Sequence, residues 1–144
     1  MSTPTTSGNA ETFAHGSDVG IRGTGNSPAQ AFERVAQALT SVVVDLARVR
    51  PSSAVELELS APDLELLLLD WVDALIYEMS TRRMLFSRFE VEIEANALRA
   101  RVLGEALELA RHQPAVEVKG ATAAELRVVH RDDGTWLAQC VVDV

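Results

Sequence analysis

The sequence of 144 residues has little of what secreted and membrane proteins contain. It holds one cysteine, Cys140, so an internal disulfide cannot form, and the reducing cytoplasm is the expected compartment. The longest apolar runs, of which residues 66–69 are one, are too short to cross a membrane. The first residues lack a basic segment followed by an apolar stretch, so no secretory signal is expected. We therefore expect a cytoplasmic protein that does not bind membranes.

Positive charge is also scarce. The chain has 13 Lys and Arg residues against 21 Asp and Glu residues, which gives a net charge of −8. Because such a chain is not built to hold a phosphate backbone over a broad surface, we expect no direct, stable binding of nucleic acid. Most of the acidity lies in residues 51–110. This segment is either a solvated face or a docking surface for a basic partner.

Lysine is almost missing. All basic residues are arginine except Lys119. Chance explains this as well as function does. If the position is functional, it requires a compact ammonium group, which a planar guanidinium does not reproduce. Lys119 is therefore a candidate functional residue.

The motifs of common enzyme classes are missing as well. The sequence contains no GxSxG nucleophile elbow and no HExxH or CxxC spacing. The glycine-rich stretch 20–25 lacks the final glycine of a dinucleotide-binding loop. Cys140 alternates with apolar residues, so we expect it to be a core thiol. We therefore expect no catalytic residue.

The apolar residues that are present predict two amphipathic helices. The first begins after the N-cap Ser27, with Pro28 in its first turn, its apolar positions continue to Leu46, and it is expected to end near Arg48. The second follows the expected N-cap Ser60, and its apolar face extends to Met79.

Alternating apolar and polar residues predict about seven strands. A tight hairpin turn is expected at residues 132–134, whose Asp-Gly pair tolerates positive φ angles, and a connection is expected over residues 104–114. The fold class is therefore α+β, with the two helices packed on one face of a mostly antiparallel sheet. The strands are expected around Phe13 and over residues 19–24, 55–59, 89–93, 98–102, 116–118, 126–130 and 136–144.

One domain accounts for most of the chain. Residues 1–11 are small and polar, and we expect them to form a disordered tail. Residues 12–144 are expected to form a single domain.

Acidic groups lie near both ends of this domain. Asp18 follows His15 in a glycine-rich turn, and Asp143 precedes Val144, the last residue of the sequence. If the first and last strands are neighbours, these oxygens converge and suit a hard divalent cation. The alternative is that Asp18 forms an Asx-turn and Asp143 is solvated.

The sequence resembles the archease family. The match to the family's His-Thr-Ala-Asp motif lies at residues 13–20, where Asp18 occupies the acidic position. The matching pieces follow the family's order and cover residues 12–144: they are residues 13–20, 31–33, 67–77, 104–105, 111–112, 117–122 and 142–144.

This resemblance implies a protein cofactor rather than an enzyme. Archeases assist the RtcB-type RNA ligase, which joins a 3′-phosphate or 2′,3′-cyclic phosphate end to a 5′-hydroxyl in tRNA splicing and RNA repair. They promote guanylylation of the ligase by GTP with Mn²⁺ and so allow multiple turnover. The expected protein partner is therefore an RtcB-type ligase.

The resemblance also implies the site. The family's metal ligands fall on Asp18, Asp143 and Val144, which would hold Ca²⁺, Mg²⁺ or Mn²⁺, and its functional lysine falls on Lys119. Supporting positions are His15, Glu105 and His112, and we expect His15 to orient its loop rather than bind metal, since oxygen-rich sites rarely recruit imidazole. The competing hypothesis is a small acidic chaperone or scaffolding module for a basic protein.

Overall fold

The computed structural model describes residues 8–144. Most of the expected tail lies outside these residues, but Ala10 and Glu11 already belong to the first strand, so the domain begins earlier than Thr12. In chain order the elements are β1 (Ala10–His15), β2 (Asp18–Gly25), α1 (Pro28–Val43), a 3₁₀ turn (Leu46–Arg48), β3 (Ser53–Ser60), α2 (Leu64–Arg82), β4 (Met84–Glu94), β5 (Ala97–Ala106), α3 (Leu109–His112), β6 (Gly120–His130) and β7 (Trp136–Asp143).

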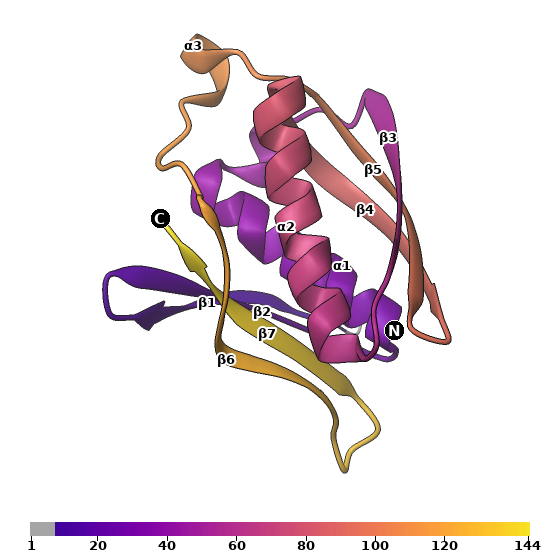
Figure 1. Cartoon of the computed structure of the whole chain (residues 1–144). Coiled ribbons are helices and arrows are strands. Elements are labelled where there is room, and N and C mark those ends of the chain that lie inside the picture. Colours follow the sequence, from indigo (N-terminus) through magenta and orange to yellow (C-terminus); the bar gives the residue numbers. More distant parts are fainter. Residues whose placement is uncertain (1–7) are drawn as a thin grey trace, which may run out of the picture.

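The described residues form two antiparallel sheets. One has the strand order β1-β2-β7-β6 and the other β3-β5-β4. The α+β class and the antiparallel pairing are confirmed, but the seven strands do not form a single sheet. Helix α1 packs against β2 of one sheet and β4 of the other, and α2 lies alongside it (Figure 1). The alternation of apolar residues reveals a buried face on each strand but not which strands are neighbours.

Helix α1 begins as predicted. The Ser27 hydroxyl accepts a hydrogen bond of 3.1 Å from the backbone N–H of Gln30. The helix ends at Val43 rather than near Arg48, because a separate 3₁₀ turn follows it. In that turn the Asp45 carboxylate accepts the N–H of Ala47. The helical spacing of apolar residues therefore continues past the end of α1 and does not indicate where the helix stops.

Helix α2 begins later than predicted. Its N-cap is Asp63, whose carboxylate accepts the N–H of Leu66 at 2.8 Å. Ser60, the predicted cap, is the last residue of β3 and pairs with Ala97. In the described part of the chain, no helix is long and apolar enough to cross a membrane.

The second half of the chain differs from prediction around the expected connection. Strand β5 continues to Ala106, so Glu105 lies in a strand, and the short helix α3 follows. The expected strand at 116–118 is an irregular segment that leads into β6. The turn between β6 and β7 is confirmed, with Gly134 at φ +89°.

The core lies around the two helices. Trp71 of α2 is fully buried, and its indole N–H donates to the carbonyl of Phe32 in α1 at 3.0 Å. Cys140 of β7 is also fully buried, which confirms the core thiol. Burial raises the pKa of this thiol to about 12, and the nearby Asp73 carboxylate adds to the rise.

Candidate functional site

The strand register brings the predicted carboxylates together. Val19 of β2 pairs with Val142 of β7, and continuing this antiparallel register places Asp18 beside Asp143. His15 of β1 pairs with Asp18, so it lies at the same end of the sheet. The last strand β7 pairs with the second strand β2 and not with the first strand β1, and this pairing brings the two carboxylates together.

The two carboxylates lie on the sheet face away from the helices. Ile21 and Cys140 form a register pair and are both fully buried in the helix-covered core. Asp18 and Asp143 are each three residues away from that pair, so they point to the opposite face. Asp143 is exposed and Asp18 is half-buried.

Lys119 joins this end of the sheet from β6. Its backbone N–H donates to the carbonyl of Asp143 at 2.8 Å. Gly120 also pairs with Asp143, so two residues of this segment oppose one residue of β7. Val118, one residue before Lys119, is buried in the core, so the exposed Lys119 side chain points away from the core, toward the face of the carboxylates. Lys119 also borders a groove against α2. Lys119 and the two carboxylates therefore lie together at this end of the sheet.

His15 contacts a residue that sequence reasoning missed. Its Nε2 lies 4.0 Å from the carboxylate of Glu125, which is half exposed like His15 itself. Glu125 adopts φ +55° in an irregularity of β6 between Thr122 and Arg127. Its carbonyl accepts a hydrogen bond from the Gln139 amide. No sequence signal marks this bulge, because its residues match an ordinary strand.

The chemistry of the donor set fits a hard divalent cation. Asp18 and Asp143 offer carboxylate oxygens on one sheet face, and Val144 offers a further oxygen next to Asp143. Within residues 8–144, no group of three or more His, Cys, Asp or Glu side chains is arranged to hold a metal. The two side-chain carboxylates would therefore need the Val144 oxygen and water to complete the shell.

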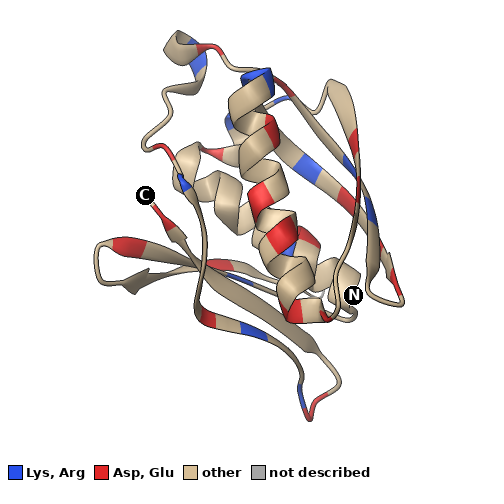
Figure 2. Cartoon of the chain, viewed as in Figure 1, with Lys and Arg blue, Asp and Glu red and all other residues tan. Residues whose placement is uncertain are grey.

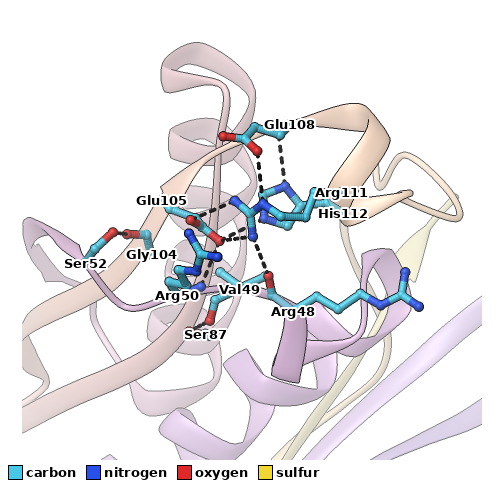
Figure 3. A network of polar contacts seen from close by, with 10 residues as sticks. All are labelled: Arg48, Val49, Arg50, Ser52, Ser87, Gly104, Glu105, Glu108, Arg111 and His112. Carbon is cyan, nitrogen blue, oxygen red and sulfur yellow. Dashed lines mark hydrogen bonds and ion pairs between the residues drawn. The ribbon is translucent and has the colours of Figure 1, made fainter.

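Glu105 and His112 lie elsewhere. They belong to a polar network between β5, α3 and the segment before β3 (Figure 3), at the end of the molecule away from the β1–β2 turn (Figure 1). The Arg111 guanidinium binds both Glu105 oxygens at 2.9 Å. The backbone N–H of Arg50 donates to the same carboxylate at 2.8 Å.

The His112 tautomer in this network is fixed by its partners. Its Nδ1 accepts the backbone N–H of Glu108, so Nε2 carries the hydrogen and donates to Glu105 at 2.9 Å. The Arg111 hydrogen bonds, with those from Arg50 and His112, hold the pKa of Glu105 at about 2. Glu105 and His112 thus hold α3 to the 3₁₀ segment and do not contribute to the Asp18–Asp143 pair.

Asp73 of α2 is a second residue that sequence reasoning missed. Its carboxylate accepts the backbone N–H of Ala121 at 2.8 Å, two residues after Lys119. Because β6 is an edge strand, this N–H has no strand partner on that side. Helical spacing placed Asp73 away from the buried face of α2 but did not indicate the strand edge that it reaches.

Comparisons with known proteins show which family this sequence is similar to. The model of the Archease protein family (MTH1598/TM1083) matches residues 11–144. Protein archease of Pyrococcus abyssi is 37% identical over 138 residues, covering 93% of this chain and 97% of that protein. Protein archease of Sulfolobus acidocaldarius is 33% identical over 136 residues, with the same two coverages.

Two solved structures share the fold. The solution structure of protein 1598 from Methanobacterium thermoautotrophicum gives a TM-score of 0.83 at 27% identity, covering 94% of this chain and 99% of that one. The crystal structure of an archease from Thermotoga maritima, described as a possible chaperone, gives a TM-score of 0.58 at 19% identity. The match covers 100% of this chain and 98% of that one. The family match and the curated relatives lead to one conclusion: this chain belongs to the archease family.

Proposed function

We propose that this protein is a non-catalytic activator of an RtcB-type RNA ligase in the cytoplasm. It promotes GTP-dependent guanylylation of the ligase and so sustains multiple turnover in tRNA splicing and RNA repair. The observation that carries the proposal is the convergence of Asp18, Asp143 and Lys119 at one end of the β1-β2-β7-β6 sheet. These are the positions that the family resemblance assigns to function.

Asp18, Asp143 and an oxygen of Val144 would hold the divalent ion. Such an ion supplies a concentrated positive charge, which neutralises the carboxylates. Without the ion, the carboxylates would repel each other and would also repel anionic groups of the ligase. The protein's part is to hold both carboxylates on one face through the antiparallel register of β2 and β7. His15, which is held near Glu125, orients the β1–β2 turn.

Lys119 would contact an anionic group of the ligase complex at the same end of the sheet. Its backbone is tied to β7 through the Asp143 carbonyl. The following residues are tied to α2 through the Asp73 carboxylate, which binds Ala121. The ammonium therefore extends from a fixed backbone, which lowers the conformational entropy lost when it binds.

The test is multiple-turnover RNA ligation by the cognate RtcB-type ligase with GTP and Mn²⁺. Substoichiometric wild-type protein should convert a stalled single turnover into sustained product formation. Lys119→Ala should not, while Arg127→Ala, which removes another exposed cation, should behave like wild type. Both variants should melt within about 2 °C of wild type, because neither residue is in the core.

A wild-type protein without effect on ligation would refute the proposal. Activity that survives Lys119→Ala but weakens steeply with salt would favour an acidic chaperone instead. Figure 2 shows where such a chaperone would bind a basic protein, since acidic residues follow one another along α2.

A further inference from the structure

A groove of about 610 Å³ lies beside Lys119. Its walls are the C-terminal half of α2, the start of β4, the end of α1 and the irregular segment before β6. The lining is mainly apolar and includes Ile76, Met79, Leu85 and Val116. Val116 in this lining remains 42% exposed. Apolar surface of this extent is typical of a binding site.

The groove also carries two cations without partners. Arg83 and Lys119 both line it, and neither side chain forms an ion pair or hydrogen bond with any residue from 8 to 144. The acidic lining residue Glu117 forms no ion pair with them. In a chain with net charge −8, two unpaired cations beside an apolar surface are complementary to an apolar ligand with negative charge.

The negative charges near the groove disfavour binding of a polyanion such as RNA. Acidic residues line the exposed side of α2 up to its basic C-terminal end (Figure 2). They would repel the successive phosphates of an RNA strand, whereas a single carboxylate within an apolar segment requires only the two cations Arg83 and Lys119. A groove whose lining is mainly apolar and includes the partly exposed Val116 suits a peptide segment.

From these contacts we propose that the groove binds a segment of the partner ligase that combines apolar side chains with a carboxylate. The apolar side chains pack on Ile76 and Met79, and the carboxylate pairs with Lys119 and Arg83. This inference rests on the proposed function and adds a specific docking mode to it.

The first test blocks the groove without disturbing the core. Ser80 is exposed and lines the groove, so Ser80→Trp fills it, while Thr81→Trp places the same ring one position away, outside the lining. Binding of the purified ligase is measured by calorimetry for both full-length variants. Ser80→Trp should weaken binding at least about tenfold, and Thr81→Trp should leave it within about twofold of wild type.

The second test concerns charge. Arg83→Glu and Arg127→Glu change the net charge equally, and both arginines are exposed and without an ion pair in residues 8–144. Arg83→Glu should weaken ligase binding about tenfold at low salt and less at high salt, whereas Arg127→Glu should not.

A photo-reactive benzoylphenylalanine at position 80 then identifies the occupant. We expect a crosslink to a ligase peptide that contains apolar residues and Asp or Glu. If wild type activates the ligase but the two tryptophan variants bind it equally, the groove proposal is wrong and the proposed function stands. A crosslink to GTP or RNA would also overturn the peptide proposal. If wild type neither binds nor activates the ligase, both proposals fail.

Discussion

At the scale of single residues, the backbone positions of Asp18 and Asp143 determine whether their carboxylates can act together. Each would be an ordinary surface carboxylate if the register of β2 and β7 differed by one residue, because a shift of one exchanges the two sheet faces. The observed pairing of Val19 with Val142 puts both on the face away from the helices. Their proposed role in metal binding is testable without the ligase.

Calorimetric titration of Ca²⁺, Mg²⁺ and Mn²⁺ into the protein tests this role. Wild type should bind at least one of these ions, and Asp18→Asn or Asp143→Asn should weaken binding at least about tenfold, because each removes a charged ligand. Asp132→Asn in the β6–β7 turn changes the net charge equally and should have no effect. Equal binding by all four proteins would show that these carboxylates are not ligands.

Glu105 gives a prediction about pH. Its pKa of about 2 lies below the ordinary value of 4.5, so the unfolded chain binds a proton at a higher pH than the folded one. The stabilisation is therefore complete above about pH 4.5 and is lost as pH falls toward 2. Urea denaturation should show Glu105→Gln to be less stable than wild type at pH 7, with the difference shrinking at pH 3. A difference that does not change with pH would contradict the assignment.

At the scale of elements, helix carboxylates cover the free edges of both sheets. Asp73 and Glu65 of α2 accept the N–H groups of Ala121 and Val128 in β6. Glu33 of α1 accepts the N–H of Val91 in β4. Partial burial raises the pKa of Glu33. Edge strands with unpaired N–H groups attract other chains, and these carboxylates prevent this.

Replacing Asp73 tests the edge contact. Asp73→Ala should destabilise the fold by about 1–2 kcal/mol, since a hydrogen bond to a charged group is lost and the amide is left to water. The Ala121 amide should also exchange with solvent faster. Asp70→Ala is the control, because the Asp70 side chain is exposed on the same helix and forms no hydrogen bond with residues 8–144. Equal stability of the two variants would contradict this account.

The start of α2 offers a second comparison. The Asp63 carboxylate caps the helix, so Asp63→Ala should cost about 1 kcal/mol in urea denaturation. Ser60→Ala should change stability by less than about 0.5 kcal/mol, because its hydroxyl is exposed and makes no hydrogen bond to the described part of the chain. A larger loss of stability for Ser60→Ala than for Asp63→Ala would indicate that Ser60 is the N-cap.

At the scale of the whole molecule, local signals in the sequence predicted local structure well. The Ser27 cap and the Asp-Gly turn depend on residues within four positions of each other, and both are confirmed. The division into two sheets and the Glu105 network depend on contacts between distant segments, such as Arg50 with Glu105. Periodicity carries no information about which distant segments meet.

The same limit applies to the site. The convergence of Asp18 and Asp143 could be expected from two strands at the ends of the domain. The position of Lys119 beside Asp143 required the β6–β7 register, and Glu125 required a bulge that no residue pattern indicates. Long-range register therefore decides the site's geometry, while the residue types decide its chemistry.

The most direct measurement of the central claim is the rate at which the cognate ligase forms its covalent guanylate from GTP and Mn²⁺. With catalytic amounts of wild-type protein this rate should rise, and with Lys119→Ala it should remain at the rate of the ligase alone. The account would be contradicted by an unchanged rate with wild type, or by an equal rise with both proteins.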